Sequence, residues 1–213
     1  MSRSEKIFEK LYESYPVLEK CKEDIEKAFQ IMLRCAENDA FVYICGNGGS
    51  AADSEHIAGE LMKGFNLKRP LSDTEKEKFS TIDGGEDIAS KLQRGIRSIS
   101  LVSQAGLISA FANDVDPSLV FAQQVYAYAK NNNDCLIALS TSGNSINVVN
   151  AVKASVAAGI NSISITGENS SKLSSLSTVT IKLPSTVTYE IQELTLPVYH
   201  ALCGAVEVEM FAE

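Results

Sequence analysis

The sequence predicts an α/β fold in which a doubly wound, mostly parallel sheet of five strands is flanked by helices. Short apolar runs alternate along the 213 residues with segments whose apolar positions recur at helical spacing, a pattern typical of parallel sheets buried between helices. Glycine-rich or serine-rich loops directly follow two of the apolar runs, where such sheets bind ligands. A chain of this length with 45% hydrophobic residues can form one compact core.

An N-terminal helical arm is expected over residues 1–37, before the sheet domain at 38–213. Apolar residues of the arm, such as Ile7 and Leu11, recur at helical spacing. Pro16 lacks a backbone N–H and is expected to divide the arm into two helices.

Within the sheet domain, five apolar runs are predicted as strands and five periodic segments as helices. The predicted strands are 41–45, 98–103, 135–140, 162–166 and 179–183. The predicted helices are 50–63, 104–112, 117–130, 145–158 and a long C-terminal helix from about 189 to 211. Because crossovers between parallel strands are right-handed, these helices can cover the sheet in regular order.

One segment, at about 66–97, interrupts the alternation of strands and helices. It contains KRPLSDTEKEKF and IDGGED, is highly charged and has no strong period. These features favour a solvated insertion between a helix and the next strand, and a lid or an oligomer contact is the alternative.

Charge and composition exclude several classes of function. A net charge of -8 disfavours nucleic acid or an anionic membrane as partner, because such binding needs clustered Lys and Arg. The five cysteines are scattered without a CxxC pair and are expected to be reduced core residues. No apolar run is long enough to cross a membrane and the N-terminus does not resemble a signal peptide, so a cytoplasmic protein is expected.

The first candidate ligand loop is the glycine loop, residues 46–50, within CGNGGSAADSEHIAGE. It follows the predicted strand FVYIC and opens a helix, where backbone N–H groups can face an anion. Gly46, Gly48 and Ala51 also match the dinucleotide pattern G-x-G-x-x-G/A. However, the next predicted strand ends in Ser103-Gln104, without the acidic residue that a dinucleotide site needs, so a nicotinamide enzyme is disfavoured.

The second candidate is the serine loop, residues 140–145, within LSTSGNS. It also lies between a predicted strand and a helix and places four hydroxyl side chains around Gly143: Ser140, Thr141, Ser142 and Ser145. Neither loop contains Lys or Arg, so a small phosphate would be held by backbone dipoles and hydroxyl groups. A serine-rich N-cap and turn is the structural alternative, and two such loops in one sheet favour the phosphate site.

The two histidines of the chain are the next candidates for chemistry. His56 and Glu60 are spaced i,i+4 on one predicted helix, so their side chains lie on one face, suited to a shared metal ion or to a base beside an imidazole. A surface contact is the alternative. His200 is eight residues after Gln192, about 12 Å along a straight helix. A kink at Pro197, a site shared between subunits, or a buried structural His200 all remain open.

Four motifs in the same order, CGNGGSAADSEHIAGE, FANDVD, LSTSGNS and IQEL followed by His200, resemble the sugar isomerase (SIS) domain and within it the phosphoheptose isomerases. The resemblance begins at about residue 20 and implies a flavodoxin-like sandwich. It also implies an intramolecular oxidoreductase, an aldose-ketose isomerase, that converts sedoheptulose 7-phosphate to D-glycero-D-manno-heptose 7-phosphate through an enediolate. A homotetramer, often with one zinc ion per subunit, and a role in heptose biosynthesis are further implications.

The resemblance also assigns residues by motif. Glu60 and His200 match the catalytic residues of the family, and His56, Glu60, Gln192 and His200 match its zinc ligands. The implied substrate-binding residues are Asn47, Gly48, Gly49, Ser50, Glu60, Asn113, Asp114, Ser140, Thr141, Ser142, Ser145 and Gln192.

Two departures and two rival functions accompany this resemblance. The insertion at 66–97 is not typical of compact members, and Tyr189 stands where many members have Asp or a small hydroxyl residue. A non-catalytic SIS-domain regulator or protein adaptor is the main rival, but such a module does not need Glu60, His56 and His200 together. An isomerase of another sugar phosphate is the second rival, because phosphate loops do not count carbon atoms.

Overall fold

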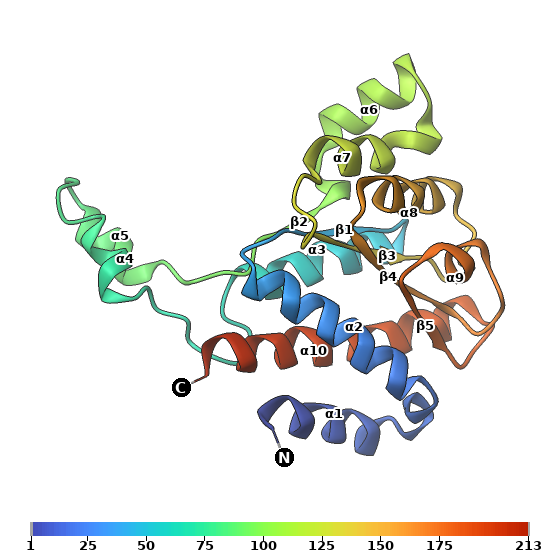
Figure 1. The fold of residues 1–213 in the computed structure, drawn as a ribbon, viewed down its shortest axis with the longest axis horizontal. Coiled ribbons are helices and arrows are strands. Elements are labelled where there is room, and N and C mark those ends of the chain that lie inside the picture. The colour runs from blue at the N-terminus through green and yellow to red at the C-terminus, as the bar shows by residue number, and fades with distance from the viewer. Residues whose placement is uncertain (1, 213) are drawn as a thin grey trace.

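The computed structural model describes residues 2–212 and contains a five-stranded parallel sheet of order β2-β1-β3-β4-β5 (Figure 1). The strands are β1 (Val42–Cys45), β2 (Ser98–Ser100), β3 (Cys135–Leu139), β4 (Asn161–Gly167) and β5 (Val179–Leu183). All four neighbouring pairs are parallel. This order is that of flavodoxin-like sheets, in which the direction of strand order reverses between β1 and β3. The predicted fold class is confirmed.

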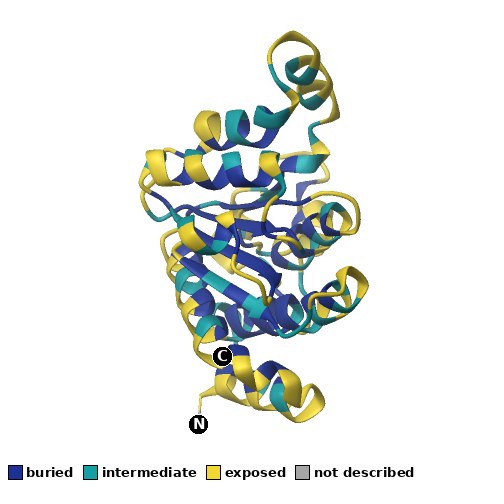
Figure 2. Cartoon of the chain, turned by 90° about the vertical axis from the view of Figure 1, so that its right-hand side faces the viewer, coloured by how far each residue is buried: buried dark blue, intermediate teal, exposed yellow. Residues whose placement is uncertain are grey.

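Helices cover both faces of the sheet. The α-helices are α1 (Arg3–Ser14), α2 (Lys22–Glu37), α3 (Gly49–Met62), α4 (Asp73–Glu77), α5 (Gly85–Lys91), α6 (Ala105–Asp114), α7 (Val120–Tyr128), α8 (Ile146–Ala158), α9 (Lys172–Leu176) and α10 (Thr188–Phe211). One face packs with α2, α3 and α10, and the other with α7 and α8. Every residue of β1 and β3 is therefore buried (Figure 2). Such strands are continuous apolar runs, which is why the sequence revealed them.

The N-terminal arm is helical but divided, as Pro16 predicted. A 3-10 helix, η1 (Pro16–Cys21), separates α1 from α2, and α1 packs along α10 rather than on the sheet (Figure 1). Elsewhere the predicted bounds were too generous. Residues 101–103 of the predicted second strand form a 3-10 turn, η2 (Leu101–Ser103), and another, η3 (Pro117–Leu119), precedes α7. The short helix α9 was not predicted.

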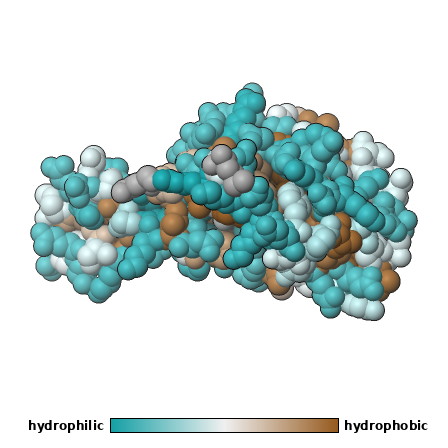
Figure 3. Space-filling model, turned by 90° about the horizontal axis from the view of Figure 1, so that it is seen from below, coloured by the Kyte–Doolittle hydropathy of each residue, from teal (hydrophilic) through white to brown (hydrophobic). Residues whose placement is uncertain are grey.

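The insertion at 66–97 contains two short helices, α4 and α5, that its sequence did not reveal. They form a projection away from the sheet, and most of its surface is hydrophilic (Figure 3). Its stem is closed by an isolated antiparallel bridge between Pro70 and Gln93. Its root is buried: the guanidinium of Arg69 is fully enclosed and contacts the carboxylate of Glu207 on α10, with Nε 2.8 Å from Oε1. The insertion is thus solvated along its length and anchored at its base.

All five cysteines are buried free thiols, as the sequence predicted. In the described part of the chain, no helix is long and apolar enough to span a membrane.

Candidate active site

The glycine loop turns sharply between β1 and α3. Gly48 has φ 56 and ψ -123, a conformation that side chains rarely adopt. A Cβ at Gly49 would lie 2.6 Å from Nε2 of Gln192, so glycine is needed for the approach of α10. The turn leaves the first backbone N–H groups of α3 without partners inside the helix, which favours a bound anion.

The serine loop occupies the equivalent position after β3. Gly143 has φ 64, and the loop ends at Ser145, the N-cap of α8. The hydroxyl of Ser140 donates a hydrogen bond to the hydroxyl of Ser145 over 3.1 Å. Asn144 braces the loop: its Oδ1 accepts a hydrogen bond from the backbone N–H of Lys172 at 3.1 Å. The loop is thus a turn held by hydrogen bonds, with hydroxyl groups at the N-terminus of α8.

A reciprocal amide pair joins the two loops. Asn47 of the glycine loop and Asn147 in the first turn of α8 exchange two hydrogen bonds, with Nδ2 to Oδ1 distances of 2.8 and 2.9 Å. The loops meet at the switch point between β1 and β3, where open parallel sheets bind ligands. Asn147 was not predicted as a site residue, although it lies only two residues beyond the LSTSGNS motif.

A polar cavity of about 370 Å³ lies beside the serine loop. Residues at or beyond the C-terminal ends of β3, β4 and β5 line it: Thr141, Ser142, Asn144, Gly167, Asn169, Ser170, Ser185, Thr186, Thr188 and Ile191. None of these residues is charged, so the cavity offers hydroxyl and amide groups to a polar ligand. The contributions from the loops after β4 and β5 were not predicted, because they depend on the order of strands in space.

The predicted pair on α3 is formed, and His200 joins it from α10. Nε2 of His56 lies 3.1 Å from Oε1 of Glu60 and 3.4 Å from Nε2 of His200. These three side chains meet within a single chain, because α3 and α10 pack against each other. The pKa of His200 is lowered by burial and by His56, which favours a neutral imidazole that can accept a proton.

Gln192 lies at the other end of this helix pair. Its amide packs against Gly49, whereas His200 faces His56. Residues early in α10 therefore contact residues early in α3, and later residues contact later ones, so the two helices run parallel. α10 continues through Pro197 without ending. In the chain described, Gln192 is therefore beside the glycine loop and is separated from the His56 and His200 pair.

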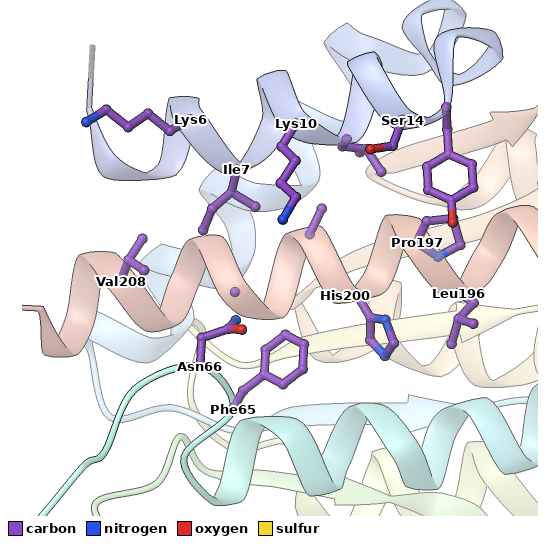
Figure 4. Close-up of a pocket in the computed structure, with 14 residues that line it drawn as sticks. Lys6, Ile7, Lys10, Ser14, Phe65, Asn66, Leu196, Pro197, His200 and Val208 are labelled. Atoms are coloured by element: carbon purple, nitrogen blue, oxygen red, sulfur yellow. The ribbon is translucent and has the colours of Figure 1, made fainter.

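His200 also lines the edge of a larger, mainly apolar cavity of about 660 Å³ between α1 and α10. Figure 4 shows its imidazole pointing from α10 toward α3, close to Phe65. The ring centroids of Phe65 and His200 are 5.4 Å apart. One side of the imidazole is thus bounded by the aromatic ring of Phe65.

Asn113 and Asp114 are not brought to the two loops in this chain. They end α6, which stands against α7 and η3 and projects from the body of the protein (Figure 1). Both side chains are exposed, and Nδ2 of Asn113 donates to Oδ1 of Asp114 over 2.8 Å.

The predicted zinc ligands are of the types that bind zinc, but only some of them lie close enough together to share one ion. Zinc takes imidazole nitrogen and carboxylate oxygen, and four tetrahedral donors at zinc distances lie about 3.3 Å apart. The distances of 3.1 and 3.4 Å from Nε2 of His56 match this spacing. Nevertheless, within residues 2–212 no group of three or more His, Cys, Asp or Glu side chains forms a ready-made metal site.

Comparison with known proteins identifies the family to which this chain belongs. The SIS domain family matches residues 9–90 and again residues 88–203. The phosphoheptose isomerase of Aliarcobacter butzleri is 33% identical over 194 residues, which cover 91% of this chain and 89% of the relative. That of Helicobacter pylori strain P12 is 33% identical over 190 residues, covering 89% and 86%.

A solved phosphoheptose isomerase from Neisseria gonorrhoeae superimposes with a TM-score of 0.71 at 27% identity, covering 97% of this chain and 99% of that one. By sequence and by fold, the chain belongs to the SIS domain family and, within it, to the phosphoheptose isomerases.

Proposed function

We propose that this protein is an aldose-ketose isomerase that converts sedoheptulose 7-phosphate to D-glycero-D-manno-heptose 7-phosphate. The observation that carries the proposal is the meeting of Glu60, His56 and His200 on the two helices that flank the glycine loop. Membership of the phosphoheptose isomerases supports the choice of substrate. A regulator that only binds sugar phosphates would not need this group of side chains.

The reaction moves the carbonyl from C2 to C1 through an enediolate. A base removes a proton from C1 and returns one to C2, while a second group moves a proton between the oxygens of C1 and C2. We assign the first role to the carboxylate of Glu60, whose side chain is only 13% exposed. His200 is assigned the second role, because its lowered pKa favours the neutral form that can both accept and donate.

The phosphate end of the substrate would be held by the two loops. From the glycine loop, we expect the phosphate to be bound by the side chain of Asn47 and by the backbone N–H groups of Gly48, Gly49 and Ser50. From the serine loop, we expect it to be bound by Ser140, Thr141, Ser142 and Ser145. Held at the far end, the sugar chain is fixed relative to Glu60 and His200, which lowers the entropic cost of the reaction. Gln192, beside Gly49, is placed to contact the sugar hydroxyls.

Asn113 and Asp114 would reach a substrate only from another subunit. Their exposed position at the end of α6 supports a homotetramer in which one chain completes the site of another.

A zinc ion is proposed at His56, Glu60 and His200. Because Gln192 of this chain lies at Gly49, away from this group, Gln192 would be a fourth ligand only from a neighbouring chain. When bound, zinc would stabilise negative charge on the enediolate oxygens. The donor types and the spacing around Nε2 of His56 support this assignment.

The test is an isomerase assay with sedoheptulose 7-phosphate and a panel of hexose and pentose phosphates, with and without added zinc. Glu60→Gln keeps the size of the side chain but removes the base, so turnover is expected to fall by about 10²- to 10⁴-fold. Glu55→Gln, on the same helix and bonded to Ser103, is the control and should retain turnover. Wild-type turnover in Glu60→Gln would refute the assigned base, and a wild-type protein that isomerises no sugar phosphate would refute the proposed function.

A further inference from the structure

Two residues without an assigned role lie behind His56. Tyr199 on α10 is 2% exposed, and its hydroxyl lies 2.9 Å from Nδ1 of His56. The same hydroxyl lies 3.3 Å from Oδ1 of Asp53, one turn before His56 on α3. The three side chains therefore form a hydrogen-bonded series in which the buried Tyr199 joins the half-buried Asp53 to His56 of the candidate active site.

The chemistry of the groups gives this series a direction. The carboxylate of Asp53 can only accept hydrogen bonds, so the Tyr199 hydroxyl donates its proton to Asp53. The phenol oxygen is then left to accept, and the group that faces it is Nδ1 of His56. Nδ1 must consequently carry the imidazole proton, and Nε2 carries the lone pair.

The direction determines what His56 presents to its other neighbours. Its Nε2 faces Oε1 of Glu60 at 3.1 Å and Nε2 of His200 at 3.4 Å. A lone pair beside a carboxylate oxygen repels it, and a cation between them removes the repulsion. The rings are also fixed in angle, since His56 meets Tyr199 and His200 edge to face at centroid distances of 5.4 and 5.0 Å.

We propose that Tyr199, held by Asp53, is a positioning residue that fixes His56 as the Nδ1–H tautomer and so leaves Nε2 free to bind a zinc ion. The role in the active site rests on the proposed function, whereas the tautomer does not. A purely structural role for Tyr199 would be satisfied by Asp53 alone. Tyr43 illustrates this case, because its buried hydroxyl bonds to Asp134 over 3.1 Å and contacts no histidine.

The tautomer can be measured directly, because the chain contains only two histidines. NMR of the zinc-free protein labelled with ¹⁵N-histidine separates a protonated from an unprotonated ring nitrogen, and His200→Gln assigns the signals. In the wild type, His56 is expected to have a protonated Nδ1 and an unprotonated Nε2. Tyr199→Phe should shift His56 toward the Nε2–H form and weaken zinc binding, measured by chelator competition, by about 10- to 100-fold.

Two further variants complete the test. Tyr43→Phe loses a buried Tyr–Asp hydrogen bond of the same kind away from the site, and should leave both the tautomer and zinc affinity unchanged. Asp53→Ala removes the acceptor but keeps the phenol, which is then free to donate to Nδ1. His56 is expected to reverse to the Nε2–H tautomer. This variant also serves if Tyr199→Phe does not fold.

The inference is overturned if the wild type has the Nε2–H tautomer, or if the folded Tyr199 and Asp53 variants keep the wild-type tautomer and zinc affinity. If the wild-type protein has the Nδ1–H tautomer of His56 but isomerises no sugar phosphate, the proposed function is refuted and the positioning role of Tyr199 stands.

Discussion

At the scale of single residues, Asn147 supports the candidate active site, although its role was not predicted from the sequence. Its amide pairs with Asn47 and thereby connects α8 to the glycine loop. Oδ1 of Asn147 also accepts a hydrogen bond from the backbone N–H of Val148. The position of Asn47, a proposed phosphate contact, therefore depends on a side chain one hundred residues further along the chain.

Replacement of Asn147 by Ala should raise KM for the sugar phosphate several-fold and reduce kcat less, because the glycine loop loses its brace while Glu60 and His200 remain in place. The free energy of unfolding should fall by about 1 kcal/mol. Steady-state kinetics and urea denaturation measure both. Asn150→Ala is the matched control, since Asn150 on the same helix bonds to Ser118 away from the loops. An equal rise in KM for both variants would contradict the role of the amide pair.

The cysteines give a second prediction at this scale. Burial raises the pKa of Cys45 and of Cys203 to about 12, so neither thiol forms the reactive thiolate near neutral pH. We expect native protein at pH 8 to resist iodoacetamide, and denatured protein to take up five labels, counted by intact mass spectrometry. Rapid labelling of the native protein would show that the core opens more readily than its packing indicates.

At the scale of elements, the insertion is tied to the end of α3 that carries Glu60. Arg69 donates to the carbonyl oxygens of Leu61 and Glu60, and so satisfies backbone groups at the C-terminus of this helix. The carboxylate of Glu207 accepts from Arg69 and from three backbone N–H groups, those of Phe65, Asn66 and Leu67. The buried ion pair thus joins the insertion, α3 and α10.

Arg69→Met is expected to lower the free energy of unfolding by about 3 to 5 kcal/mol, because it leaves the buried charge of Glu207 without its counter-charge. Lys91→Met, in the same insertion, breaks an ion pair with Asp87 in which both side chains are about 70% exposed, and should cost less than about 1 kcal/mol. Urea denaturation with a common m-value compares the two. Similar losses would mean that the buried pair adds no more than the exposed one.

At the scale of the whole molecule, one chain brings together only part of the proposed site. Glu60, His56 and His200 meet within a single chain, while Asn113 and Asp114 stand on a projecting helix. If the site is shared, two inactive variants can complement one another only when their lost residues come from different subunits.

Mixing Glu60→Gln and Asn113→Ala subunits after reversible dissociation should therefore restore activity, up to about a quarter of the wild-type value for random association. Mixing Glu60→Gln with His200→Ala should restore little, because these residues serve the same site from the same chain. Isomerase assays before and after mixing provide the measurement. Absence of restoration in the first mixture would place Asn113 outside a shared site.

The local features of this protein could be predicted from its sequence. The buried strands are continuous apolar runs, the two loops are defined by glycine and hydroxyl residues, and the pairing of His56 with Glu60 follows from helical spacing. Each of these depends on residues close in the chain, so local chemistry is sufficient to predict it.

Contacts between residues far apart in the chain, in contrast, follow from the packing of the complete fold. The parallel packing of α3 and α10 brings His200 to His56 and leaves Gln192 at Gly49. The sheet order brings Asn47 to Asn147, and the buried Arg69 reaches Glu207 from a segment whose sequence has no clear period. These contacts depend on strand order and helix register, which arise from burial of the whole core and have no signature in any short stretch of sequence.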